Sequence, residues 1–151
     1  MEARMGHPAM VVPSAMKSLL ALGRCVSETG LSPQLVELVN LRASQINGCS
    51  VCVDMHAKAL RKTGESDERL FTVAAWREAP YFTGEERAAL ALAEAVTRLC
   101  DRAEAVADEV WREAACHFDE QQLGALILAI ATVNLWNRLN AATKQVAGAW
   151  G

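Results

Sequence analysis

Apolar side chains recur three or four positions apart along most of this chain, which is the spacing of one face of an α-helix. The segment from Ser32 to Ile46 shows it clearly, with Leu35, Leu38 and Val39 on one predicted face. Proline, glycine and capping residues interrupt the pattern at intervals. The pattern therefore predicts an all-α fold, a single-domain bundle of about seven helices.

Capping and turn signals set the expected helix boundaries. Ser32 followed by Pro33 is typical of a helix start, and Thr83 with Glu86 forms a capping box. The residues before position 14 are expected to be irregular. We expect helices at 14–28, 32–46, 50–62, 66–78, 83–100, 105–116 and 119–147, in one domain over 1–151 whose core motif spans about 32–64.

Length and composition agree with a folded helical protein. A chain of 151 residues suits one compact domain that needs no disulfide bonds for stability. Apolar residues make up 52% of the chain and charged residues 22%, which excludes intrinsic disorder. Ala and Leu, with 27 and 17 residues, outnumber the 8 aromatic residues, and this balance favours helix over strand.

The charge pattern argues against nucleic acid and membranes as partners. The net charge is −3, and no basic run is present that would neutralise several phosphates. The best candidate for a membrane span, Leu123–Trp136, has only 14 residues and suits a core helix. The N-terminal segment has no apolar stretch typical of a signal peptide, so we expect a cytoplasmic protein.

The five cysteines favour metal or redox chemistry over a framework of structural disulfides, because their number is odd and the sequence has no export signal. Only Cys49 and Cys52 are close together in the sequence. Cys25, Cys100 and Cys116 fall on apolar helix faces and are predicted to be core residues.

The segment Cys49-x-x-Cys52-x-x-x-His56 has the geometry of a site. At about 100° per residue, Cys52 lies about 60° and His56 about 20° from Cys49 around a helix, so all three share one face. A helix start at Cys49 supplies backbone donors that stabilise a thiolate. His56 can accept the thiol proton, and Glu37 on the preceding helix is the candidate carboxylate, since the turn at Asn47-Gly48 folds that helix back.

The motif has other interpretations, among them a zinc site and a haem site. Zinc requires four ligands, and the motif supplies three. A c-type haem site requires a histidine directly after the second cysteine, where this chain has Val53. Two buried, inert cysteines beside a surface histidine remain an alternative, as does zinc.

Together these residues resemble a known family. Glu37, Cys49, Cys52 and His56, followed by Ala59-Leu60 and Gly64, are similar to the core of the alkylhydroperoxidase D (AhpD) and carboxymuconolactone decarboxylase superfamily. Later segments resemble its AhpD-like members, so that the resemblance spans nearly the whole chain: Trp76–Pro80, Phe82-Thr83, Glu86–Leu90 and Asn134–Leu139.

The resemblance implies a peroxidase that reduces hydroperoxides by cycling the cysteine pair between dithiol and disulfide. It implies that Cys52 attacks the peroxide, that Cys49 closes the disulfide, and that Glu37 and His56 relay protons. No cofactor or metal is implied. The expected partners are a hydroperoxide substrate, an external dithiol, lipoyl-type or thioredoxin-like reductant, and copies of the same chain in a trimer or hexamer.

One position departs from the family pattern. Val51 stands where the best-studied members have a histidine, so the relay is expected to be shorter and peroxidase activity weaker. The alternatives are a disulfide oxidoreductase acting on a protein or lipoyl-type partner, and a non-enzymatic helical oligomer that senses redox state or binds metal. Decarboxylation fits poorly, because decarboxylases of the superfamily typically lack the cysteine pair.

The remaining polar and aromatic residues receive structural interpretations. Asn134, Asn137 and Arg138 are expected to form hydrogen bonds in the core or at an interface. His7 is placed in the irregular N-terminal tail, and His117 on the surface or at an interface. Packing or subunit contacts are expected for the four tryptophans, Trp76, Trp111, Trp136 and Trp150.

Overall fold

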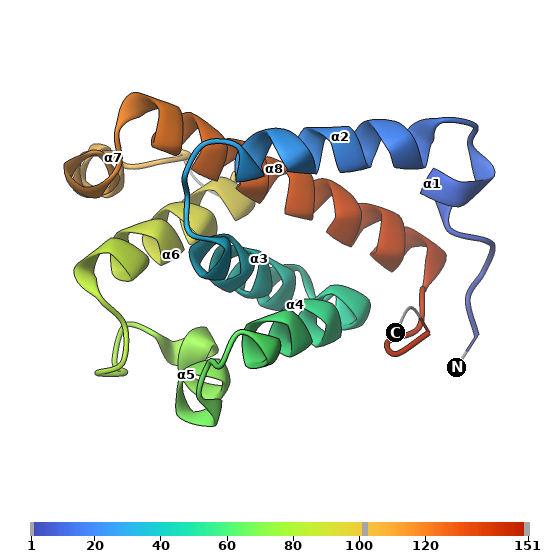
Figure 1. The fold of residues 1–151 in the computed structure, drawn as a ribbon, viewed down its shortest axis with the longest axis horizontal. Coiled ribbons are helices and arrows are strands. Elements are labelled where there is room, and N and C mark those ends of the chain that lie inside the picture. The colour runs from blue at the N-terminus through green and yellow to red at the C-terminus, as the bar shows by residue number, and fades with distance from the viewer. Residues whose placement is uncertain (1, 101–102, 150–151) are drawn as a thin grey trace.

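This computed structural model describes residues 2–100 and 103–149, which contain eight α-helices, one 3₁₀-helix and no strand (Figure 1). The helices are α1 (Pro8–Val11), α2 (Ala15–Ser27), α3 (Pro33–Asn47), α4 (Ser50–Lys62), α5 (Asp67–Thr72), the 3₁₀-helix η1 (Val73–Ala75), α6 (Gly84–Thr97), α7 (Asp108–His117) and α8 (Glu120–Thr143). The predicted all-α class is confirmed.

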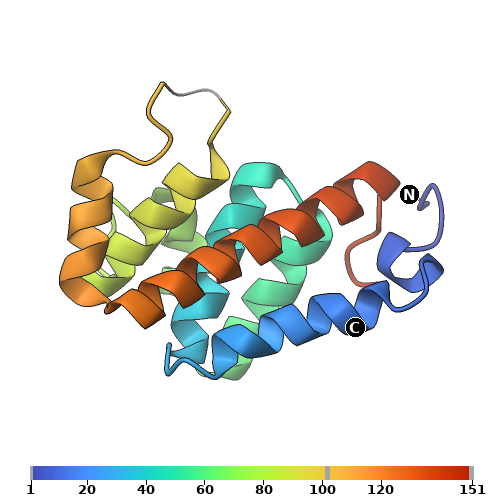
Figure 2. The same cartoon turned by 90° about the horizontal axis from the view of Figure 1, so that it is seen from above.

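Helix α3 lies at the centre of the bundle and packs against α4, α6 and α8. Helix α8 is the longest helix, with 24 residues, and α2 lies along it (Figure 2). Helix α7 packs mainly on α6 at the other end of the molecule from α1. No helix in the described part of the chain is both long and apolar enough to cross a membrane.

The turn between α3 and α4 sets the position of the cysteine motif. Ser32 caps α3, as its sequence predicted, and accepts a hydrogen bond from the N–H of Leu35. Gly48 ends α3 with a left-handed φ of 66°, a conformation that costs glycine little. Cys49 follows directly as the N-cap of α4, so the motif stands at a helix start as predicted.

Two apolar clusters form most of the core. One lies among α2, α3, α6, α7 and α8 and includes Leu92 and Ile130, and the other lies among α3, α4, α5 and α6 and includes Leu41 and Leu60. All four of these side chains are at most 1% exposed. Burying one such side chain contributes about 1.5–3 kcal/mol, so the first cluster holds α3 against α8 and the second holds it against α4.

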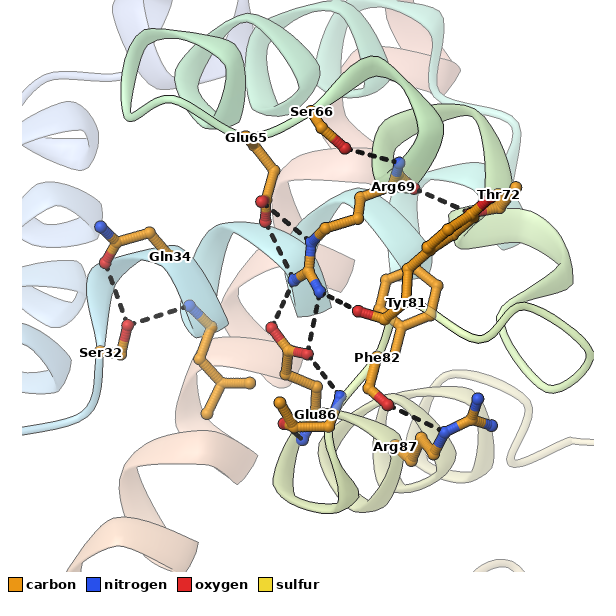
Figure 3. Close-up of polar contacts among 12 residues, drawn as sticks. Ser32, Gln34, Glu65, Ser66, Arg69, Thr72, Tyr81, Phe82, Glu86 and Arg87 are labelled. Atoms are coloured by element: carbon orange, nitrogen blue, oxygen red, sulfur yellow. Dashed lines mark hydrogen bonds and ion pairs between the residues drawn. The ribbon is translucent and has the colours of Figure 1, made fainter.

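A charged cluster joins α5 to the start of α6 (Figure 3). Arg69 binds Glu65 and Glu86 through its guanidinium, which also lies 5.0 Å from the ring centroid of Phe82. Burial acts to raise the pKa of Glu86, but hydrogen bonds from Arg69 and Thr83 hold that pKa below its ordinary value. The predicted capping box of Thr83 and Glu86 is present in this cluster.

A second charged cluster is buried around Glu94 of α6. Its carboxylate accepts hydrogen bonds from Arg42 Nε at 2.7 Å and from Trp76 Nε1 at 3.0 Å, and it also binds Arg77. The Glu94 side chain is 5% exposed. Burial alone would raise the pKa of Glu94, but its three donors outweigh burial and hold the pKa below its ordinary value. The cluster ties α3 and α6 to the segment after η1.

The prediction of one helix over 66–78 is wrong beyond Thr72. The hydroxyl of Thr72 donates to the carbonyl of Glu68 at 2.6 Å, a contact that competes with the regular helix and bends it. The chain then tightens into η1 and turns. This turn places Trp76, which is 5% exposed, where its indole N–H reaches Glu94.

Other helix ends also differ from the expected ones. Helix α6 ends at Thr97 because the backbone of Arg98 leaves the helical region, and α8 ends at Thr143 because Lys144 adopts a left-handed φ of 52° that caps the last carbonyl groups. Helix α7 begins at Asp108, later than expected. The N-terminal stretch, expected to be irregular, contains α1, which His7 caps. The apolar periodicity extends beyond the true ends of these helices. Helix boundaries that are predicted from it are therefore wrong by several residues.

The expectation that Cys25, Cys100 and Cys116 are core residues is wrong, because all three are exposed free cysteines. Cys25 lies on the outward face of α2, and Cys100 lies beyond the end of α6. Trp76 is buried, whereas Trp111 is 43% exposed. Trp150 lies outside the described residues.

Asparagines of α8 form buried hydrogen bonds with α3 and α6. Asn47 donates to the side-chain oxygens of Asn134 and Asn137, at 2.9 and 2.8 Å. Asn137 in turn donates to Ser44, and Asn134 donates to Thr97. These contacts fix the position of α8 beside the cysteine turn.

Candidate active site

Cys49 and Cys52 are joined by a disulfide bond at the start of α4, with their Cα atoms 5.4 Å apart. The sulfur of Cys49 accepts a hydrogen bond from the backbone N–H of Cys52 at 3.3 Å, as an N-cap side chain does. The two residues are 3% and 4% exposed. A thiolate at Cys49 would therefore be stabilised by the free backbone donors of the helix start.

Cys52 lines a cavity of about 560 Å³ between α2, α3, α4 and α8. Cys49 is not among the lining residues in the described part of the chain. The wall of the cavity is mainly apolar and includes Met16, Leu20, Val36, Met55, Val133 and Trp136. A small molecule that enters this cavity therefore meets Cys52 rather than Cys49.

Glu37 and His56, which the sequence singled out, are in direct contact. The Nδ1 atom of His56 lies 2.7 Å from Oε2 of Glu37, and both side chains line the cavity. They are partly buried, with 18% of the His56 side chain and 31% of the Glu37 side chain exposed. When Nδ1 donates to the carboxylate, the other ring nitrogen of a neutral His56 is an acceptor. The structure thus brings Glu37, His56 and Cys52 to one cavity.

Asn140 is a site residue that the sequence analysis did not identify. Its amide Nδ2 donates to Sγ of Cys52 at 3.2 Å, although the two residues are 88 positions apart. Asn140 is 8% exposed and lines the cavity. The available signal was the spacing of Asn134, Asn137 and Asn140, which places successive amides about 60° apart around a mainly apolar helix.

His7 is a second residue whose position the sequence did not predict. His7 was expected in the irregular N-terminal tail, but it is only 4% exposed and lines the cavity. Its ring centroid lies 5.6 Å from that of Trp136. Burial lowers the pKa of His7 below its ordinary value, and a hydrogen bond with Asn140 opposes this effect. The sequence signal for an ordered segment here was Pro8, which directly follows His7, because proline is typical of the first position of a helix.

The described residues contain no group of three or more His, Cys, Asp and Glu side chains arranged to hold a metal ion.

We predict that oxidation of the reduced protein joins Cys49 only to Cys52. Their Cα separation of 5.4 Å suits a disulfide, whereas Cys25, Cys100 and Cys116 are free and exposed. A peptide map after treatment with a mild oxidant and alkylation under denaturing conditions should show three alkylated cysteines and one disulfide. If a disulfide between any other pair of cysteines formed first, the assignment of Cys49 and Cys52 as the redox pair would be wrong.

Comparison with known proteins identifies the family. The model of the carboxymuconolactone decarboxylase family matches residues 13–95, and the chain belongs to this family as an AhpD-like member. It is 35% identical over 132 residues to the uncharacterized protein YdfG of Bacillus subtilis (strain 168), covering 87% of this chain and 88% of that protein.

Solved structures show the same fold. A protein of unknown function from Agrobacterium tumefaciens, for which a role as the antioxidant defence protein AhpD has been suggested, is 34% identical and superposes with a TM-score of 0.90, covering 97% of this chain and 98% of its own. The debrominase Bmp8 superposes with a TM-score of 0.75 at 21% identity, covering 91% of this chain and 73% of its own. The similarity to Bmp8 is a similarity of fold.

Proposed function

We propose that the protein is a thiol-dependent alkyl hydroperoxide reductase, a peroxidase that cycles Cys49 and Cys52 between dithiol and disulfide. The observation that carries this proposal is the opening of Cys52 onto an apolar cavity that also contains the bonded Glu37–His56 pair. Membership of an AhpD-like family supports a redox role for the pair.

The first step oxidises Cys52. Its thiol gives a proton to His56, whose imidazolium the carboxylate of Glu37 stabilises. The thiolate sulfur attacks the terminal oxygen of the hydroperoxide, so that an S–O bond forms while the O–O bond breaks. The alkoxide leaving group takes a proton from His56 and departs as the alcohol, and Cys52 becomes a sulfenic acid.

The second step forms the disulfide. The thiol of Cys49 gives up its proton, and its thiolate attacks the sulfur of Cys52. An S–S bond forms, the S–O bond breaks, and the hydroxide takes up that proton and leaves as water. An external dithiol then supplies two electrons and two protons through a mixed disulfide and restores both thiols. The disulfide in the structure corresponds to the state before this reduction.

The cavity supports an organic hydroperoxide as the substrate. Its volume of about 560 Å³ lies within the usual range for small-molecule sites, and its mainly apolar wall gains free energy by burying an alkyl or aryl group. Because Cys49 and Cys52 are only 3–4% exposed, a small or slender partner reaches them more readily than a folded protein disulfide does. This burial favours the peroxidase over a general protein disulfide oxidoreductase.

The proposal includes a dithiol reductant of the lipoyl class, which as a small and slender partner suits the burial of Cys49 and Cys52 better than a thioredoxin-like protein does. It also includes assembly of the chain into a homo-oligomer, a trimer or hexamer, in the cytoplasm. Large apolar side chains on the surface support assembly, among them Met10, Val11, Val12 and Leu20, each more than 50% exposed.

The test is consumption of cumene hydroperoxide and hydrogen peroxide in the presence of dihydrolipoamide. We expect sustained turnover, faster with cumene hydroperoxide, that falls to background in the Cys52→Ser variant. Cys116→Ser is the matched control, because Cys116 is an exposed free cysteine and its loss should leave turnover unchanged. Turnover equal in the parent and in Cys52→Ser would refute the proposal.

A further inference from the structure

Cys52 receives a hydrogen bond from α8 that is separate from the Glu37–His56 pair of α3 and α4. The donor is Nδ2 of Asn140, 3.2 Å from Sγ, and both residues are at least nine-tenths buried. Burial disfavours a thiolate, because it removes the water that would solvate the charge. A charged sulfur is also a stronger acceptor than the neutral disulfide sulfur, so this contact strengthens when Cys52 is reduced and loses its thiol proton.

His7 forms a hydrogen bond with the side-chain amide of Asn140. The Nδ1 atom of His7 accepts a hydrogen bond from the N–H of Ala9 at 3.1 Å, so the proton of the neutral ring is on Nε2. Nδ2 of Asn140 is engaged with Cys52, so in the hydrogen bond between His7 and Asn140 the Nε2–H of His7 is the donor and the amide oxygen of Asn140 is the acceptor. With its oxygen bound to His7, Asn140 turns its NH₂ group toward Cys52.

The N-terminal segment holds His7 in this place. The backbone N–H of Arg4 donates to the carbonyl of Thr143 at 2.9 Å, and the side chain of Gln145 donates to the carbonyl of Met5 at 3.1 Å. These contacts fasten the segment to the end of α8, one turn from Asn140. The chain of contacts therefore runs from the N-terminal segment through His7 and Asn140 to the sulfur.

We propose that Asn140 stabilises the thiolate of Cys52 and that His7 is the positioning residue that keeps the Asn140 amide in its donating orientation. The inference rests on the proposed function only in taking the thiolate as the reactive form of Cys52. Asn140 is neutral, so its contribution does not depend on its own titration. The titratable side chains that line the cavity beside it are His7, Glu37 and His56.

The test measures the reactivity of Cys52 directly, without peroxide. In a Cys49→Ser background, Cys52 is the only thiol of the tryptic peptide 43–58, so its alkylation can be followed by mass spectrometry while the other cysteines fall in other peptides. In the Asn140→Leu variant we expect the pH midpoint of alkylation to rise and the rate near neutral pH to fall about tenfold. An unchanged pH profile would overturn the role of Asn140.

Two substitutions of His7 separate positioning from helix capping. His7→Gln places an amide N–H near the former Nε2 and loses the cap of α1, whereas His7→Asn keeps an acceptor for Ala9 and loses the donor to Asn140. We expect His7→Gln to keep the parent alkylation profile and His7→Asn to approach Asn140→Leu. The reverse order would show that His7 only caps α1, and would overturn its positioning role. Thermal unfolding followed by circular dichroism confirms that each compared variant is folded.

Peroxide turnover of the parent protein separates this inference from the proposed function. A parent without turnover, whose Cys52 alkylation still depends on Asn140, would refute the peroxidase and keep the hydrogen-bond chain. A parent with turnover, whose Cys52 alkylation is the same in the parent and in Asn140→Leu, would refute the chain and keep the peroxidase.

Discussion

Peroxide turnover should fall about 10²-fold when either Glu37 or His56 is replaced by Gln, and the double variant should be no slower than the slower single variant. The two side chains meet at 2.7 Å, and one proton path through His56 needs both of them. Residues that act as one unit show effects that do not add. Turnover of cumene hydroperoxide by the parent, the two single variants and the double variant measures this directly.

The control for the Glu37–His56 prediction is Asp54→Asn on the same helix. Asp54 pairs with Lys58 one turn away, and their side chains are 32% and 59% exposed. Surface pairs of this kind contribute about 0–1 kcal/mol, so turnover should stay at the parent level. If both single variants also kept the parent rate, the cysteines alone would carry the chemistry. If the double variant lost turnover by the product of the two single-variant factors, Glu37 and His56 would act independently.

Glu94→Gln should destabilise the fold by about 3 kcal/mol near neutral pH, which is the cost of leaving a buried charge unpaired. The Arg42 side chain that Glu94 binds is 11% exposed, so little water replaces the lost carboxylate. Urea unfolding of the parent and the variant gives the difference in the free energy of unfolding. Glu109→Gln is the matched control, because Glu109 and Arg112 are 78% and 69% exposed, and its cost should stay below about 1 kcal/mol.

The stabilisation by Glu94 should disappear in acid. Its pKa in the folded protein lies below the ordinary value of 4.5, so the unfolded chain binds this proton more tightly than the native state. The contribution is therefore fully present above about pH 4.5 and is lost as the pH falls through the folded-state pKa. The difference between the parent and Glu94→Gln should shrink correspondingly. A difference that stayed constant from neutral to acid pH would show that the carboxylate charge contributes nothing.

Local sequence determined the helical class and the centre of the site. Helical spacing places Cys49, Cys52 and His56 on one face of α4, and the turn at Gly48 folds α3 back so that Glu37 meets His56. These relations follow from short-range geometry, since each depends on a helix period or on one turn with a left-handed glycine. For the same reason the capping signals at Ser32 and Thr83 marked true helix starts.

Tertiary structure decided the rest, because no local rule connects residues that are distant in the chain. His7 and Asn140 belong to opposite ends of the sequence, and only the docking of the N-terminal segment on α8 brings both to Cys52. The exposure of Cys25 and Cys116 depends on which helix face finds a neighbour, which apolar spacing does not specify. The cavity likewise exists only where four helices meet, so its apolar wall and its access to Cys52 alone among the cysteines were decided by packing.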